Sequence, residues 1–509
     1  MYKAPARKTV SQACDACRRR KIKCNGLHPC PGCISANLSC TFDVPQKRGG
    51  NRGARATVLN ELRAGQQQDE DTSVGDSQTE TTMSTHQGAS QSPRDLAGGL
   101  EAITIDACIE TYLRRIQPVV PLLTPDILRE EASQTSMSLL SRQFIISFCA
   151  YVVTFSKILD DPLFPAAQTP EGDLGERLLE AALRIQNSER VTKPSRLSVY
   201  ISFFLYGAHA GLGDYRQGWF YLREATTLFM IQKAGGEWYE VTAYRCLFWV
   251  LVISERAHGI RRNRPITLQV THSSPALDDP SERGLQYLAA IFRPFDEVFF
   301  AVWNGSRLEC NKDWLLGLER DVRTALPPIL DVSNEQIANL RVSQLWLQIK
   351  LWELFPRFGF LSSESVYECL TFRYPTVVAK DLTILAMKLP IASFQIHGVG
   401  MTEKIFDIAC ALADILPFIS TSASHFELGP IDYLTQTASL LAKLPDGSAK
   451  FVPLLLTKVN ELLPELVKTL CEIVQLPVMA LNDPMSPDTR FVYEEEVGRG
   501  LYLDLRRGR

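Results

Sequence analysis

The 509-residue sequence has no apolar run long enough to cross a membrane. Its most apolar stretches, Phe144–Phe155 and Cys246–Ile253, are much shorter than the roughly 20 residues that a bilayer requires. The first residues, MYKAPARKTVSQ, have no apolar centre, so we expect neither a secretory signal nor a membrane segment. We therefore expect a reducing compartment, where clustered thiols bind metal more often than they form disulfides.

Motifs of catalysis are also lacking. The patterns H-E-x-x-H, G-x-S-x-G and G-x4-G-K-[ST] do not occur, and no G-x-G-x-x-G follows a predicted strand. Nothing in the sequence assigns two acidic side chains to one cleft. We therefore predict no catalytic residues and no enzyme, and we interpret His209 and His258 as structural histidines rather than metal ligands.

A strong net charge is absent as well, but the average of −3 conceals two opposite parts. Residues 1–63 hold thirteen Lys or Arg against three Asp or Glu, a charge of +10, which leaves −13 for the rest of the chain. Six thiolates with two Zn²⁺ would lower the first part only to about +8. A basic arm on an acidic body is typical of a polyanion-binding module attached to a separate globular domain.

Six of the thirteen cysteines are clustered: Cys14, Cys17, Cys24, Cys30, Cys33 and Cys40. Their spacing is two near copies of C-x2-C-x6-C. Two tetrahedral zinc ions need eight ligand positions, and six thiolates supply eight if two of them bridge both metals. A single four-cysteine finger would leave two thiols over, and iron–sulfur ligation does not account for the repeat. The sequence therefore predicts a site for two Zn²⁺ ions. The other seven cysteines occur singly and are interpreted as small buried hydrophobes.

Basic residues lie directly beside the cluster, at Arg18, Arg19, Arg20, Lys21 and Lys23. They offset the negative charge of the thiolates and leave a positive face for phosphates. A nuclear-localisation signal is a second interpretation of this run, and it does not exclude the first.

Composition divides the chain into four parts. We predict a zinc module over residues 1–45, a basic and then polar flexible linker over 46–99, a large helical domain over 100–480 and a loose tail over 481–509. In the helical domain apolar residues recur at helical spacing, and no alternation suggests a sheet. The expected fold class is therefore mainly α: a small two-zinc, six-cysteine module joined by a disordered linker to an all-helical domain.

Several segments of this domain are predicted as individual helices. The first has its apolar face at Ile105–Ile116 and stops at Pro118. The others are Leu174–Ile185, Val199–Ala210, Trp219–Ile231, Val241–His258, Gln344–Leu354, Lys404–Leu416 and Val459–Val474. The Val241–His258 helix is apolar enough to be a core element, and the charged run from Glu255 to Arg264 is expected to form its wetter end, with ion pairs inside the domain.

The segment CDACRRRKIKCNGLHPCPGCISANLSC resembles the fungal Zn₂Cys₆ binuclear-cluster transcription factors. The resemblance implies that Cys14 and Cys30 bridge the two zincs, and that Lys21, with Arg20 beside it, contacts the guanines of a CGG-type triplet. A lysine near a helix C-terminus can reach guanine O6 and N7 in the major groove, which agrees with this assignment. Arg18, Arg19 and Lys23 are expected to hold phosphates.

The helical domain is similar to the fungal-specific regulatory domain, in GWFYLREA and in YRCLFWVLVISERAHGIRRNRPITL, and most similar to activators of maltose and starch utilisation. We therefore predict a nuclear, DNA-binding RNA polymerase II regulator, an activator of a metabolic or secondary-metabolite gene set. It would bind double-stranded CGG-containing DNA as a homodimer and contact the transcription machinery or coactivators. A repressor or a metabolite-sensing regulator with the same module is the alternative. A zinc module for protein or RNA binding, and a helical domain with enzyme activity, are further hypotheses.

Overall fold

The structure is a computed structural model that describes residues 13–19, 23–36, 40–42, 102–156, 174–185, 187–235, 241–307, 309–419, 428–475, 492–493 and 496–497. The chain divides into two compact units, Met1–Ser90 and Gln91–Arg509. We call the first the zinc module and the second the helical domain. The predicted linker, 46–99, lies outside the described residues, as does most of the predicted tail.

The zinc module has two short helices, α1 (Asp15–Arg19) and α2 (Pro31–Ile34). Its buried centre consists of Cys14, Cys17, Cys30, Cys33 and Cys40. Among residues 13–19, 23–36 and 40–42, only Ala16, Cys24 and Phe42 pack against this centre. So few apolar side chains cannot stabilise a fold of this size without a metal.

The helical domain contains only helices and turns within its described part, which confirms the mainly α fold class. The longer helices are α5 (Ala102–Thr111), α6 (Pro125–Ser133), α7 (Leu139–Ser156), α8 (Leu174–Arg184), α10 (Arg196–Gly211), α11 (Tyr215–Gly235), α12 (Val241–Arg262), α13 (Arg283–Phe292), α14 (Glu297–Trp303), α15 (Lys312–Thr324), α16 (Asn334–Trp352), α18 (Tyr374–Lys388), α20 (Gly398–Ile415), α21 (Pro430–Ala442), α22 (Val452–Leu462) and α23 (Pro464–Val474). Single-turn helices connect several of them. None of the helices in the described ranges is both long and apolar enough to span a bilayer.

The helix starts follow ordinary capping chemistry. At α16, Ser333 Oγ accepts a hydrogen bond from the Gln336 backbone N–H, and the Gln336 side chain accepts one from the Ser333 N–H. This capping box satisfies two backbone donors that have no partner inside the helix. Proline at the first turn starts α18, α21, α22 and α23, because its fixed φ suits that position.

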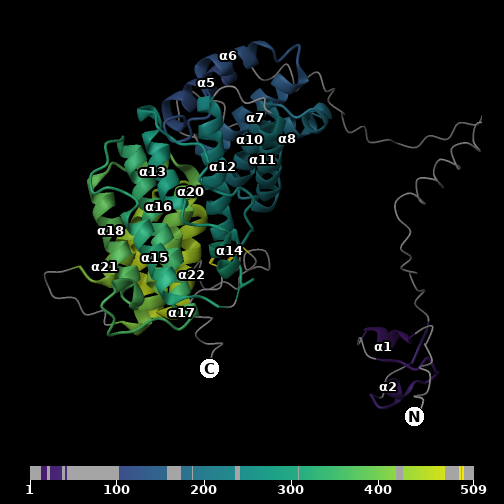
Figure 1. Cartoon of the computed structure of the whole chain (residues 1–509). Coiled ribbons are helices and arrows are strands. Elements are labelled where there is room, and N and C mark those ends of the chain that lie inside the picture. Colours follow the sequence, from purple (N-terminus) through teal and green to yellow (C-terminus); the bar gives the residue numbers. More distant parts are fainter. Residues whose placement is uncertain are drawn as a thin grey trace, which may run out of the picture. The chain divides into compact units, whose positions relative to one another are not determined.

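The domain has two hydrophobic cores. The first core lies among α7, α8, α10 and α11, with the apolar face of α12, and includes Phe148, Phe204 and Leu247. The second core surrounds α16 and α20 and includes Trp346 and Phe406. Figure 1 shows the corresponding two groups of helices, with α12 running between them.

The expectation that Glu255–Arg264 forms a wetter helix end is wrong for most of that run. Glu255 is 2% and Arg256 0% exposed. Arg256 Nε donates to the carbonyl of Phe295 at 2.8 Å, and the Glu255 carboxylate accepts from the backbone N–H of Thr267 and Leu268 at 2.7 and 2.8 Å. These buried charges are satisfied by backbone groups of the loop after α12 and of the turn between α13 and α14.

The expected ion pairs are present, at the end of α12. Arg261 contacts Glu403 and Asp407 of α20 and also Glu496 near the C-terminus, and Arg262 contacts Glu403 and Glu496. All five side chains are at most 11% exposed. Burial by itself would raise the pKa of Asp407, but Arg261 and Lys350 lower it to about 2. We call Arg261, Arg262, Glu403, Asp407 and Glu496 the inter-core ion cluster.

The predicted helix Val459–Val474 is wrong in its extent. The structure has α22 ending at Leu462 and α23 beginning at Pro464, with Leu463 between them at φ −147° and ψ 71°. Proline has no N–H to donate and disfavours helical backbone at the residue before it, so one helix becomes two. The other predicted helices correspond to α5 with the π-turn Tyr112–Ile116, and to α8, α10, α11, α12, α16 and α20.

We expect acid to destabilise the helical domain already between pH 6.5 and 5. Burial lowers the pKa of His258 to about 3 and that of His397 to about 4, so both imidazoles stay neutral while those of the unfolded chain gain protons below about 6.5. The unfolded state then binds more protons, so each histidine should lower the free energy of unfolding by about 2 kcal/mol at pH 5.

Urea unfolding followed by tryptophan fluorescence measures the free energy of unfolding of the helical domain at each pH, because all seven tryptophans lie within residues 219–352. His397→Gln keeps a donor for the Glu335 carbonyl, which lies 2.8 Å from His397 Nε2. This substitution should reduce by about half the free energy of unfolding that is lost on acidification. His272→Gln, at an exposed position, should leave it unchanged. Equal free energies of unfolding of the unaltered protein at pH 6.5 and 5 would contradict the prediction.

Candidate metal centre

Each C-x2-C pair is built on one of the two short helices. Cys14 directly precedes α1 and Cys17 lies within it, while Cys30 is the N-cap of α2 and Cys33 lies within that helix. Residues three apart share one face of a helical turn, so each pair presents two thiols in one direction. Cys24 and Cys40 come from the segments that follow the helices.

The sulfur atoms lie at distances that suit a shared metal. Cys14 Sγ is 3.5 Å from Cys33 Sγ and 3.8 Å from Cys30 Sγ, and Cys17 Sγ is 3.5 Å from Cys30 Sγ. Two thiolates bound to one tetrahedral zinc, each at about 2.3 Å, are about 3.8 Å apart. These three distances are therefore close to those of thiolates that share a zinc ion.

Two groups of four thiols stand out. Cys14, Cys17, Cys24 and Cys30 form one, and Cys14, Cys30, Cys33 and Cys40 form the other; within each group the sulfurs lie within 4.8 Å of one another. Cys14 and Cys30 belong to both. Each group offers the four ligands of one zinc, so six cysteines supply two ions, and the expected cofactor, two Zn²⁺ per chain, is confirmed.

Backbone amides support the thiolates. The Cys17 N–H donates to Cys14 Sγ at 3.5 Å, the Gly26 N–H to Cys24 Sγ at 3.4 Å and the Cys30 N–H to Cys40 Sγ at 3.4 Å. The first of these hydrogen bonds lowers the pKa of the Cys14 thiol. Amide donors stabilise the deprotonated sulfur, which is the form that binds metal.

One further contact joins the two halves of the module. The Asp15 backbone N–H donates to the Thr41 carbonyl at 2.8 Å, and Thr41 Oγ1 donates to Asp15 Oδ2 at 3.0 Å. The contact links the start of α1 to the residue after the last cysteine. The cysteine spacing does not predict this contact, because neither residue belongs to the ligand pattern.

The predicted DNA contacts are only partly described. Arg18 and Arg19 belong to α1, and Lys23 is exposed immediately before Cys24. Arg20 and Lys21 lie outside the described residues. The roles of all five in DNA binding stay predictions.

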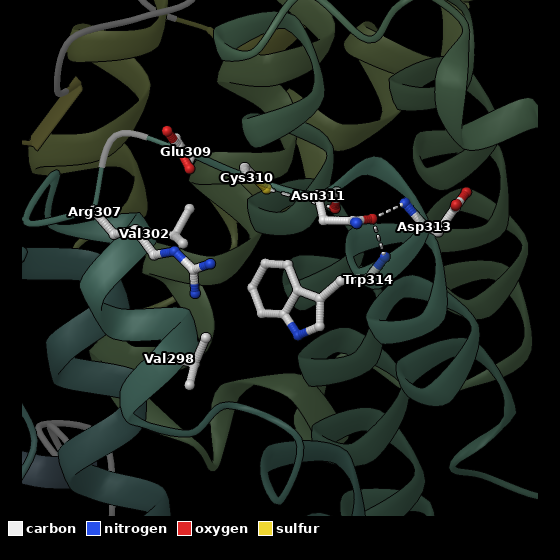
Figure 2. A pocket seen from close by; sticks show the side chains of 8 residues that line it. All are labelled: Val298, Val302, Arg307, Glu309, Cys310, Asn311, Asp313 and Trp314. Carbon is white, nitrogen blue, oxygen red and sulfur yellow. Dashed lines mark hydrogen bonds between the residues drawn. The ribbon is translucent and has the colours of Figure 1, made fainter.

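The helical domain has a pocket of about 370 Å³ between α14 and α15 (Figure 2). Figure 2 shows the Trp314 indole opposite Val298, Val302 and Arg307. The Asn311 side chain is already used, because it caps α15 by accepting from the N–H groups of Asp313 and Trp314. Burial raises the pKa of the Cys310 thiol, which disfavours the nucleophilic thiolate. We therefore assign no reaction to the groups that line this pocket.

The six cysteines form a two-zinc module on a chain with a large helical domain. Residues 12–49 match the family model of the fungal Zn(2)-Cys(6) binuclear cluster domain. The maltose fermentation regulatory protein MAL13 of Saccharomyces cerevisiae is 22% identical over 421 residues, 80% of this chain and 84% of its own length. The probable sucrose utilization protein SUC1 of Candida albicans is 23% identical over 444 residues, 83% and 82% of the two chains.

Transcription factor PDR1 of Candida glabrata is 61% identical, but over only 36 residues, 7% of this chain and 3% of its own. The similarity to MAL13 and SUC1 covers at least 80% of this chain and therefore includes much of the helical domain. The chain is a DNA-binding transcription regulator, as the sequence predicted, and its residues 12–49 are similar to the Zn(2)-Cys(6) cluster domain.

We expect substitutions of the shared and unshared cysteines to have different effects on zinc content. Cys14→Ala or Cys30→Ala removes a ligand from both groups of four. Each of these variants should bind much less than about one zinc ion per chain. Cys17→Ala or Cys33→Ala weakens one group and should leave about one ion.

Native mass spectrometry of the full chain measures the stoichiometry. Cys310→Ala, a partly exposed cysteine of the helical domain, should keep both ions. Equal zinc loss in all four cluster variants would contradict the sharing of Cys14 and Cys30.

Proposed function

We propose that this chain is a nuclear transcription activator of genes for the use of an oligosaccharide of the maltose or sucrose type. The observation that carries the proposal is the similarity to MAL13 and SUC1, which covers at least 80% of this chain and at least 82% of each relative. The names of those relatives refer to maltose fermentation and sucrose utilization. Because the similarity includes the helical domain, it supports a related regulatory task as well as a shared DNA-binding module.

In this proposal the zinc module reads a CGG-type triplet. Lys21, assisted by Arg20, contacts the guanine edges, while Arg18, Arg19 and Lys23 hold phosphates on either side. The exposed position of Lys23 next to Cys24 supports a phosphate contact there. Such contacts fix the register of the module on the duplex without reading sequence.

Dimerisation follows from the size of the site. One cluster reads about three base pairs, which is too little for selective binding in a genome, so we propose a homodimer on two half-sites. The dimer contact lies either in the helical domain or near Val58, Leu59 and Leu62, an apolar set in the segment TVLNELR, which lies outside the described residues. Transcription machinery or coactivators would then be contacted by the helical domain.

We expect Lys21→Ala and Arg18→Ala to weaken DNA binding in different ways. Lys21→Ala should remove the preference for CGG-containing duplexes over scrambled ones, a loss of about 1–3 kcal/mol in discrimination. Arg18→Ala should weaken binding to both duplexes alike and reduce the salt dependence by about one counterion. Fluorescence anisotropy at several salt concentrations measures both effects. A CGG preference that survives in Lys21→Ala would refute the assignment of that residue.

The regulated pathway is tested by transcript profiling of a strain that lacks this chain. On maltose or sucrose as carbon source, transcripts of the corresponding hydrolases and transporters should fall at least about tenfold relative to the parent strain, a change of about 1.4 kcal/mol if promoter occupancy controls them. On glucose the two strains should agree. A rise of the same transcripts in the deletion strain would instead identify a repressor, and an unchanged carbohydrate set would overturn the pathway.

A further inference from the structure

A cavity of about 220 Å³ lies between the two cores of the helical domain. Its lining includes Tyr151 and Phe203 of the first core and Trp346 and Met401 of the second. The helices α7, α10, α12, α16 and α20 all contribute to it. The volume is below the range of roughly 300–1,000 Å³ that drug-sized ligands occupy, so an occupant must be small.

Most of the lining is apolar, and aromatic rings form much of it: Tyr151, Phe155, Phe203, Tyr206 and Trp346. The polar lining includes two histidines, His258 and His397. Both are neutral near pH 7, because burial lowers their pKa values to about 3 and about 4. The charge of the cavity is therefore set by its arginine, lysine and glutamate residues.

Three of the four charged lining residues belong to the inter-core ion cluster and are paired within it. These are Arg261, Arg262 and Glu403. The fourth, Lys404, has a different environment. Its Nζ donates to Ser343 Oγ at 2.8 Å and lies 5.9 Å from the Trp346 ring centroid. No carboxylate of the described chain lies within ion-pair distance of this ammonium.

An ammonium has three hydrogens to donate, and the Ser343 hydroxyl accepts one of them. Burial lowers the pKa of Lys404 to about 8, and Glu403 opposes that shift without forming an ion pair. Lys404 is partly buried, and a partly buried cation without an anionic partner carries a desolvation cost that a bound anion would relieve. The geometry thus places an unneutralised cation on the wall of a small aromatic cavity.

We propose that this cavity binds a small organic monocarboxylate, with its carboxylate on Lys404 and its apolar part among Tyr151, Phe203 and Trp346. An anion matches the one lining cation that lacks a counter-charge, and an apolar body matches the aromatic walls. Binding at this site requires neither DNA nor zinc, so it can be tested independently of the proposed function.

The test is isothermal titration of the full-length zinc-loaded protein, without DNA, using 3-phenylpropionate and its neutral amide as probes. The carboxylate should bind saturably with one site per chain, and the amide at least about tenfold more weakly. Lys404→Met should remove this difference, whereas Lys380→Met, at an exposed lysine of α18, should preserve it. Equal affinities of carboxylate and amide would overturn the assignment of an anion.

A second variant pair keeps the proposal testable if Lys404→Met does not fold. Gly400 lines the cavity, and a Cβ built there meets no atom within 4 Å. Gly400→Leu should therefore fill free space and weaken 3-phenylpropionate at least about tenfold while the unfolding temperature is maintained. Gly317→Leu, a position on α15 with equally free space, is the matched control and should bind like the unaltered protein.

Maltose is included as a neutral probe of different chemistry. Saturable maltose binding that Gly400→Leu abolishes, with no binding of the carboxylate, would overturn the ligand class in favour of a neutral carbohydrate. Failure of every probe to bind saturably would overturn the cavity as a site for small ligands. Neither result would bear on DNA recognition or on the regulated genes, which are measured separately.

Discussion

The helical domain depends on the burial of like and unlike charges between its two cores. Arg261 and Arg262 reach from the end of α12 to the carboxylates of α20 and of Glu496, so a single cluster joins the first core, the second core and the C-terminal segment. Such pairs add little net stability over apolar packing, but the loss of one partner costs about 3–5 kcal/mol, because the other charge stays buried. The cluster therefore penalises the loss of any one partner more than it strengthens the packing of the two cores.

The zinc module differs from the helical domain in that it has too few apolar side chains to form a hydrophobic core. Cys14 and Cys30 occupy the position of a core: they are fully buried, and each belongs to both groups of four ligands. Metal binding and folding are then one event, and the fold is encoded in ligand spacing rather than in hydrophobic pattern. The Asp15–Thr41 contact adds a hydrogen-bonded link between the two halves, independent of the metal.

This difference explains what the sequence could predict. Ligand spacing is local, so the six cysteines and two zincs followed from positions within 27 residues, and helical periodicity was enough for the fold class. The inter-core ion cluster was not predictable, because Arg261 and Glu496 are 235 residues apart and the charged run at the end of α12 resembles a solvated helix end. Pro464 was visible in the sequence, yet apolar periodicity on both sides of it concealed the break between α22 and α23.

The position of the cavity also says how an occupant could act. The cavity and the inter-core ion cluster share α12 and α20, and Arg261, Arg262 and Glu403 belong to both. A ligand shifts a conformational equilibrium only by its difference in affinity for the two states. An occupant that contacts both cores gains affinity only when they are docked, so it favours that arrangement over any in which α12 and α20 separate. A ligand held by one core alone would stabilise the domain without changing how the cores dock.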